Sequence, residues 1–221
     1  MIADRFVPPS LSVLDVGCGR GFFSFACARK TKQVTCLDLM DGRGRTGWWR
    51  EFRDSTKLLK LGKRVSGVRG DAASLPFVRE RFDVVTSVHA VRNFRTKGEI
   101  RSFFLEALRT LKKGGRMILA ESDIEGNRHR AYNAFYSLRV KLGYELDLPQ
   151  FSIMVRWLKN AGFAEVSVLS IDIGLKYAPV RLPYDRSAMK GLEGSYRKAE
   201  RLVQEEGDSH PPILVLTATK P

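Results

Sequence analysis

The chain has 221 residues and carries 38 Lys and Arg against 24 Asp and Glu, a net charge of +14 with 43% apolar residues. This length and apolar fraction predict a single globular domain over residues 1–221 and exclude a disordered chain. We expect a cytoplasmic protein, because no apolar run is long enough to span a bilayer and the N-terminus lacks a signal-peptide pattern. The positive charge favours a polyanionic partner such as RNA, although an arginine-rich proteome would give the same balance. Three cysteines without metal-site spacing predict free thiols and no bound metal.

A glycine turn follows the first apolar run. Residues 11–16 predict a strand, Gly17-Cys18-Gly19-Arg20-Gly21 predicts a tight turn, and the pattern to Ala28 predicts a helix. Its third glycine comes one residue earlier than in the dinucleotide-binding fingerprint. Asp15 would repel a pyrophosphate but suits an ammonium group. The turn therefore predicts a nucleoside ligand with a cationic tail.

Two further carboxylates stand at the ends of predicted strands. Residues 33–39 read as a second strand, which places Asp38 about twenty residues after the glycine turn, where a carboxylate accepts from ribose hydroxyls. A helix cap or turn is the alternative for this residue. Residues 65–70 read as a third strand followed by Asp71, whose alternative role is an Asx turn.

The segment after the second strand combines arginine, glycine and tryptophan. Arg43 and Arg45 lie among glycines, and Trp48 opens a predicted helix. Guanidinium and indole groups suit an anionic or aromatic substrate. The alternative is that the tryptophan packs this helix onto the sheet and the arginines are solvated.

A histidine follows the predicted fourth strand, residues 82–88. His89 stands at the edge where ligands bind in open α/β sheets. Its ordinary pKa suits proton abstraction, so it is our candidate general base. The alternative is a histidine that only lines the cofactor site.

The rest of the chain predicts helices and strands in alternation. Amphipathic spacing predicts a helix over 97–111 that ends with Lys112, Lys113 and Gly114. A strand over 116–120 follows. Helices are then expected at 128–145 and 152–160, a strand at 163–171, a helical face between 188 and 202, and a last strand at 213–218.

Three segments together resemble the class I S-adenosylmethionine (SAM)-dependent methyltransferases: DVGCGRG at 15–21, GDAASLPF at 70–77 and LRTLKKGGRMILAES at 108–122. The resemblance covers about residues 11–172. It implies an α/β, Rossmann-like sandwich with a seven-stranded, mostly parallel sheet and an antiparallel last strand. It also implies SAM as cofactor, with Asp71 accepting from the adenine amino group. The cofactor residues implied are Asp15, Gly17, Cys18, Gly19, Gly21, Asp38, Leu39, Asp71, Ala72 and Val88.

Two segments resemble a narrower branch, the ubiquinone/menaquinone-biosynthesis C-methyltransferases. These are AVRNF at 90–94 and the aromatic stretch at 131–143, although the N-terminal region of that branch is missing. By this resemblance Tyr132 and Tyr136 would contact substrate, while their helical spacing fits core packing equally well.

Three functions remain open from the sequence. The first is methyl transfer to a small-molecule acceptor of quinone-like or aromatic type, which the resemblance favours. The second is an RNA methyltransferase that uses the Arg43–Trp48 segment and the charge of +14. The third is a non-catalytic SAM- or RNA-binding module. The sequence leaves the oligomeric state open.

Overall fold

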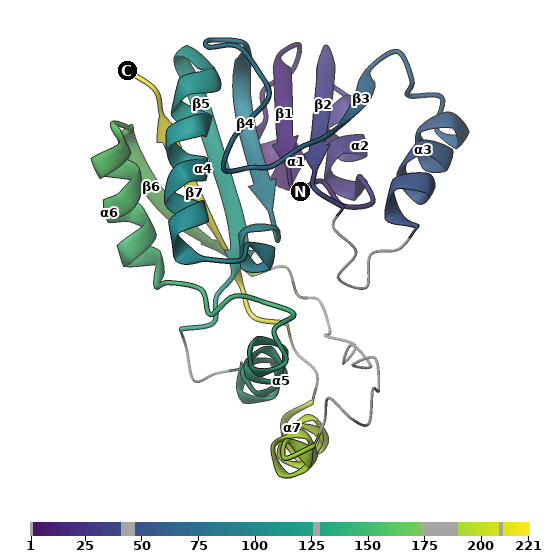
Figure 1. Ribbon diagram of the computed structural model, residues 1–221, viewed down its shortest axis with the longest axis vertical. Coiled ribbons are helices and arrows are strands. Elements are labelled where there is room, and N and C mark those ends of the chain that lie inside the picture. Colours follow the sequence, from purple (N-terminus) through teal and green to yellow (C-terminus); the bar gives the residue numbers. More distant parts are fainter. Residues whose placement is uncertain (1, 41–46, 126–128, 173, 175–189, 208–209) are drawn as a thin grey trace.

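The computed structural model describes residues 2–40, 47–125, 129–172, 174, 190–207 and 210–221. One seven-stranded sheet runs through it, in the order β3-β2-β1-β4-β5-β7-β6 (Figure 1). The strands are β1 (Ser12–Val16), β2 (Gln33–Asp38), β3 (Val65–Arg69), β4 (Phe82–Val88), β5 (Leu111–Ser122), β6 (Ala164–Ile171) and β7 (Ile213–Thr219).

The sheet is parallel except at one edge. Strands β3, β2, β1, β4 and β5 pair in parallel, and β7 lies antiparallel to both β5 and β6. The predicted α/β class, with a mostly parallel sheet and an antiparallel last strand, is confirmed. The carboxyl ends of five parallel strands therefore meet at one edge, where residues distant in sequence come together.

One predicted boundary is wrong. Lys112, Lys113 and Gly114 do not end a helix, because β5 already begins at Leu111. The Leu111 backbone is extended, with φ −68° and ψ 141°, its side chain is fully buried, and it pairs with Phe82 of β4. Strand pairing and burial outweigh the helix-ending composition here.

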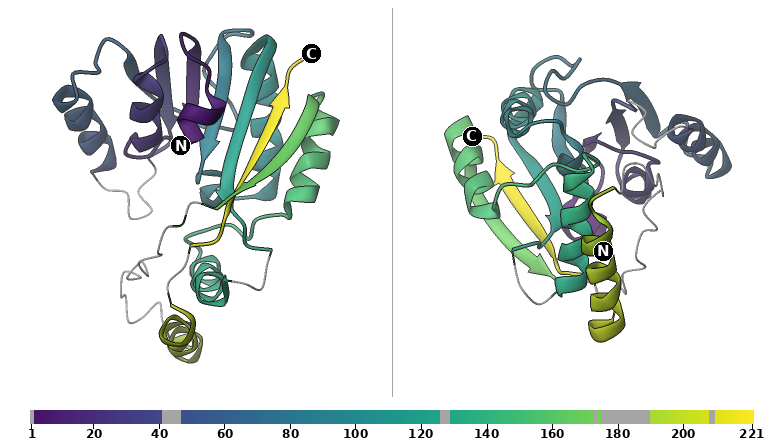
Figure 2. Two further views of the ribbon diagram at one scale, coloured as in Figure 1. Left: turned by 180° about the vertical axis from the view of Figure 1, so that it is seen from behind. Right: turned by 60° about the horizontal axis from the view of Figure 1, so that its bottom comes forward.

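Helices cover both faces of the sheet. On one face α4 and α6 pack, and on the other α1, α2 and α3, while α5 and α7 pack against each other beyond the carboxyl ends of the strands (Figures 1 and 2). The helices are α1 (Ile2–Phe6), α2 (Phe22–Ala28), α3 (Trp48–Leu58), α4 (Lys97–Thr110), α5 (Arg130–Lys141), α6 (Phe151–Ala161) and α7 (Glu193–Glu206), with a 3₁₀ turn at Val91–Asn93. Among the described residues, no helix is both long and apolar enough to cross a membrane.

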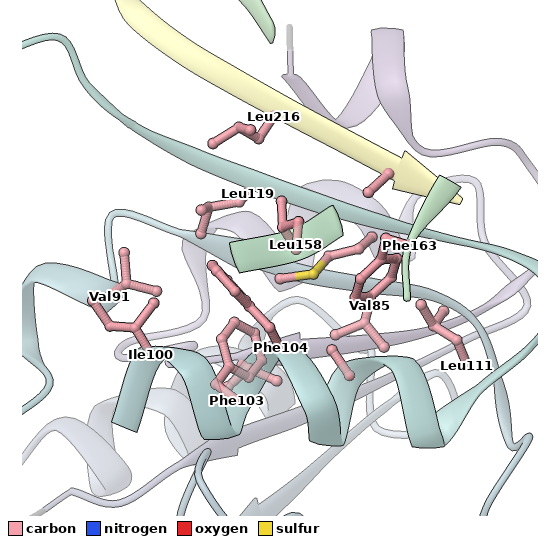
Figure 3. Packing of buried hydrophobic residues seen from close by; sticks show 14 of the residues in the cluster. Val85, Val91, Ile100, Phe103, Phe104, Leu111, Leu119, Leu158, Phe163 and Leu216 are labelled. Carbon is pink, nitrogen blue, oxygen red and sulfur yellow. The ribbon is translucent and has the colours of Figure 1, made fainter. Parts of the chain in front are cut away.

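The larger core lies between the sheet and the α4–α6 layer. Phe103 and Phe104 of α4 point into it, against Val85 and Leu119 of the sheet and Leu158 of α6 (Figure 3). Each of these five side chains is at most 1% exposed, and burial of such a side chain contributes about 1.5–3 kcal/mol. This packing holds the strand ends, and the polar residues that follow them, in fixed positions.

Candidate active site

A cavity of about 520 Å³ opens at the carboxyl ends of the parallel strands. It lies where the strand order reverses between β1 and β4, the usual ligand position in open α/β sheets. Its wall consists of Gly17, Cys18, Gly19, Arg20, Phe22, Phe23, Leu37, Asp38, Leu39, Trp48, Gly70, Asp71, Ala72, Val88, His89, Ala90, Asn93, Phe94, Arg95 and Glu99. Eight of the ten residues predicted for the cofactor are in this wall.

The glycine turn forms one side of the cavity. Gly17 has a φ of +74°, and its N–H donates to Leu37 O at 2.7 Å, which ties the turn to the end of β2. A side chain at Gly17 would collide with Ala90. Gly21 lies outside the wall, with a φ of +88° at the start of α2. A Cβ at Gly21 would come within 2.7 Å of the Phe52 ring, so Gly21 acts in packing α2 against α3.

Asp38 connects the glycine turn to the second strand. Its Oδ2 accepts from Gly19 N at 2.9 Å and its Oδ1 from Met40 N at 2.8 Å. A carboxylate offers about four acceptor positions, so each oxygen keeps one for a ligand in the cavity that Asp38 lines. Asp71 lines the same cavity and also forms the Asx turn that we considered, through Ala73 N to Oδ1 at 2.8 Å.

Asp15 does not line the described cavity. It is 1% exposed, and its two oxygens accept from Ser24 Oγ at 2.5 Å and Thr86 Oγ1 at 3.0 Å. Burial raises the pKa of the Asp15 carboxyl to about 6, although both hydroxyls favour its charged form. Asp15 thus connects β1 to α2 and β4 through these hydrogen bonds. Its expected contact with the ammonium group of a ligand stays a prediction.

Trp48 lies over the glycine turn from the first residue of α3. It is in the cavity wall, and a Cβ at Gly19 would come within 3.3 Å of its ring. The Arg20 guanidinium lies 5.1 Å from the centre of the same ring. Arg43 and Arg45, which we predicted as substrate residues together with Trp48, lie outside the described residues.

His89 lines the far end of the cavity, directly after β4. Its φ is +51°, a conformation that a residue with a side chain adopts at a cost of about 1–3 kcal/mol and that is concentrated at functional sites. Its N–H donates to Ala120 O of β5 at 2.8 Å. Val88 before it and Asn93 and Phe94 after it complete this end of the wall.

A buried charged pair lies behind His89. Arg92 is 6% exposed and Glu121, near the end of β5, is fully buried. Arg92 Nε donates to Glu121 Oε2 at 2.7 Å, and Arg92 Nη1 donates to Tyr132 OH at 2.9 Å. Burial alone would raise the pKa of the Glu121 carboxyl, but Arg92 and His89 hold it below its ordinary value. Glu121 is therefore an anion beside the cavity.

Tyr132 and Tyr136, for which we considered both substrate contact and core packing, are not in the wall of the cavity described. Both are at most 5% exposed, in a core cluster shared by α5 and α7. The Tyr136 hydroxyl donates to Leu146 O at 2.6 Å and accepts from Leu148 N at 2.8 Å. Tyr132 binds the Arg92 guanidinium. The Tyr132 hydroxyl also donates to Ser122 of β5, so it links α5 to the sheet, while the Tyr136 hydroxyl links α5 to the segment before α6.

Comparisons with known proteins agree with this geometry. Residues 14–119 match the family described as "Methyltransferase domain". The chain is 33% identical over 189 residues to the demethylmenaquinone methyltransferase of Renibacterium salmoninarum, covering 76% of this chain and 72% of that protein. The chain belongs to the class I SAM-dependent methyltransferases.

Two further similarities extend this result. Over 129 residues the methyltransferase is 34% identical to the ubiquinone/menaquinone biosynthesis C-methyltransferase UbiE of Pseudomonas putida, covering 56% of this chain and 47% of that one. The structure of phosphoethanolamine N-methyltransferase 2 of Haemonchus contortus in complex with SAM is also similar. The alignment covers all of this chain and 51% of that one, with a TM-score of 0.61 and 18% identity. The predicted enzyme class and cofactor are confirmed.

The residues of the cavity fit SAM. The volume of the cavity is within the range of small-molecule sites, and the Asp38 and Asp71 carboxylates lie at one end of it. Gly17, Cys18 and Gly19 of the glycine turn line the cavity as well, so a ligand there can lie close to the backbone. We propose that Asp38 binds the ribose hydroxyls and that Asp71 and Ala72 bind the adenine, as the sequence suggested.

We did not predict the partners of His89 from the sequence. Glu121 and Arg92 were read only as parts of motifs, and His210 was given no role. His210 comes from the far end of the chain, and its ring centre lies 6.1 Å from that of His89. Burial lowers the pKa of the His210 imidazole. One feature of the sequence indicated that Glu121 lies near His89: it directly follows the strand predicted over 116–120, as His89 follows the strand predicted over 82–88.

Proposed function

We propose that this methyltransferase transfers the methyl group of SAM to a ring carbon of a hydroxylated aromatic small molecule of the quinol type. One observation carries the proposal: a single cavity is lined by Asp38 and Asp71 at one end and by His89 and Phe94 at the other. In this proposal the donor and a ring-shaped acceptor share this one cavity. The names of the relatives, which describe menaquinone and ubiquinone C-methylation, support this acceptor class.

His89 is the base in this proposal. When bound, SAM supplies a methyl group on a positively charged sulfur, and the transfer releases S-adenosylhomocysteine. His89 accepts the proton of the acceptor hydroxyl, which increases electron density on the ring carbon that forms the new bond. The hydrogen on that carbon is then lost as a proton, so the ring regains its aromaticity. Phe94 supplies an aromatic side chain to the wall of the cavity, against which the ring can pack.

The test is methyl transfer from labelled SAM by the purified chain. The acceptors are a 1,4-naphthoquinol with a short alkyl chain, the same compound oxidised to the quinone, and bulk RNA. We expect label in the organic extract with the quinol alone, because only the reduced ring has a hydroxyl proton to remove.

Two results would contradict the proposal. Label only in nuclease-sensitive material would favour the RNA methyltransferase that the charge of +14 suggested. Label in no fraction, with S-adenosylhomocysteine binding intact, would favour the non-catalytic binding module.

A further inference from the structure

His89 faces two charged side chains through one ring nitrogen. Its Nδ1 lies 3.6 Å from Glu121 Oε2 and 3.4 Å from Arg92 Nη2. Glu121 can only accept a hydrogen from Nδ1, whereas Arg92 can only donate one to it. The two neighbours therefore favour opposite tautomers of the imidazole, and the hydrogens of Arg92 decide between them.

The two hydrogens of Arg92 Nη2 have three acceptors within reach. Nη2 donates to Ser122 Oγ at 3.1 Å, lies 3.4 Å from His89 Nδ1 and forms an ion pair with Glu121 Oε2 at 2.5 Å. The carboxylate is charged and is the nearest of the three, so it competes for these hydrogens more strongly than a neutral ring nitrogen does. This competition favours a hydrogen on Nδ1, between His89 and Glu121.

We propose that Glu121 is a positioning residue, whose carboxylate holds His89 in the tautomer with hydrogen on Nδ1 and leaves Nε2 free to take a proton. The proposal rests on the proposed function for the source of that proton, the acceptor hydroxyl. In the step, the O–H bond breaks, Nε2 gains the proton and Nδ1 keeps its own. The resulting imidazolium lies beside the Glu121 anion, and the proton later leaves to solvent.

The burial of Glu121 supports this role. Its second oxygen, Oε1, is buried and has no hydrogen-bond partner among the residues that the structure describes. A buried acceptor without a hydrogen-bond partner destabilises a fold, so it calls for an explanation beyond packing. Arg92 compensates the negative charge of Glu121. Glu121 can therefore stay ionised beside His89, where a carboxylate orients a histidine that acts as a base.

The separation of 3.6 Å between Nδ1 and Oε2 is longer than a hydrogen bond. Such bonds are often long without ligand and shorten when substrate binds. The remaining parts of the pair are fixed: Tyr132 OH donates to Ser122 Oγ at 2.9 Å and accepts from Arg92. Closing the gap therefore requires movement of the half-exposed His89 ring only.

The tautomer is measured on the full chain labelled with ¹⁵N-histidine, at a pH where the imidazoles are neutral. Long-range ¹H–¹⁵N spectra show which nitrogen carries hydrogen, and three histidines give few signals. The spectrum of His89→Gln identifies the His89 signal. We expect the wild type to carry hydrogen on Nδ1. Hydrogen on Nε2 in the wild type would overturn the proposal, whatever any variant does.

Glu121→Gln tests the cause. Its amide can donate to Nδ1, so we expect the His89 signal to shift towards the Nε2–H tautomer. Glu145→Gln is the matched control, because Glu145 belongs to the same buried network, paired with Arg139 at 2.9 Å and 4.0 Å from Arg92 Nη1. We expect this control to leave the tautomer unchanged. An unchanged tautomer in Glu121→Gln would overturn the assignment to Glu121.

Kinetics separate positioning from general damage. With the quinol acceptor, Glu121→Gln should lower kcat about tenfold or more while KM changes less than about twofold. A higher KM with an unchanged kcat would contradict the positioning role. The spectra are recorded without a methyl acceptor. If no acceptor is methylated, the proposed function is contradicted, while the tautomer measurement still tests the role of Glu121.

Discussion

His89 Nδ1 and Glu121 Oε2 lie 3.6 Å apart, each near the carboxyl end of one of two adjacent parallel strands. The two residues are 32 positions apart in the sequence, and only the pairing of β4 with β5 brings them together. The same edge of the sheet carries Asp38 and Asp71. The groups that we propose to bind the donor and to accept a proton thus lie at one edge of the sheet, which can orient a substrate.

Replacing the base should slow the reaction. His89→Gln removes the group that takes the acceptor proton, so we expect kcat to fall at least about tenfold. S-adenosylhomocysteine should still bind with an affinity within about threefold of wild type, because the carboxylates at the other end of the cavity are unchanged. His129→Gln is the control, since His129 is outside the cavity wall. Full activity of His89→Gln would remove this residue from the mechanism.

The ribose assignment is tested by calorimetry. Asp38→Ala deletes a charged acceptor for two hydroxyls, so S-adenosylhomocysteine binding should weaken by at least about 1–2 kcal/mol. The variant also loses the bonds from Gly19 N and Met40 N, which hold the turn in place. Asp54→Ala, an exposed carboxylate on α3, should bind as the wild type does. Equal affinities for both variants would contradict the ribose role.

The close approach at the glycine turn predicts a difference between two glycines. Gly17 and Gly114 both have positive φ, +74° and +69°, so alanine strains both by about 1–2 kcal/mol. A Cβ at Gly17 would also collide with Ala90, whereas one at Gly114 meets nothing within 4 Å. Gly17→Ala should therefore lose more unfolding free energy in urea, and at least about tenfold in S-adenosylhomocysteine affinity. Equal losses in the two variants would show that the collision is relieved by movement of the loop.

Much of the fold and of the donor site could be predicted from the sequence. Parallel strands place their carboxyl ends at one edge, so Asp38, Asp71 and His89 could be expected together once each was recognised as following a strand. The aromatic residues of α5 could not be placed this way. Helical spacing looks the same whether Tyr132 faces a cavity or a core, and the hydroxyl partners that decide it come from other elements.

Tertiary contacts also explain two further features that the sequence did not indicate. The run from Lys112 to Gly114 satisfies the rules for a helix end, yet pairing with β4 extends β5 through it. Asp15 precedes the glycine turn in sequence, but its strand position directs it to Ser24 and Thr86. Neither contact can be inferred from the residues next to it in the sequence.

The burial of Asp15 predicts how stability depends on pH. The pKa of its carboxyl is about 6 in the fold against an ordinary value of 3.8, so the folded state binds the proton more tightly than the unfolded state. The contribution of Asp15 to stability is therefore fully present below about pH 3.8 and is lost as the pH rises through 6. The full loss is about 3 kcal/mol, since one pKa unit corresponds to 1.36 kcal/mol.

Asp15→Asn removes this titration and should change the balance between acid and neutral pH. We compare the free energy of unfolding of the variant with that of the wild type, measured in urea. The difference, variant minus wild type, should be about 2 kcal/mol larger at pH 7.5 than at pH 4.5, so the variant gains relative stability at the higher pH. The comparison of the two proteins at each pH cancels the titration of the other carboxyls. Asp54→Asn on the exposed face of α3 is the control and should follow the wild type at both values. A difference between Asp15→Asn and wild type that does not change with pH would mean that Asp15 is already ionised throughout this range, with Ser24 and Thr86 compensating its burial in full.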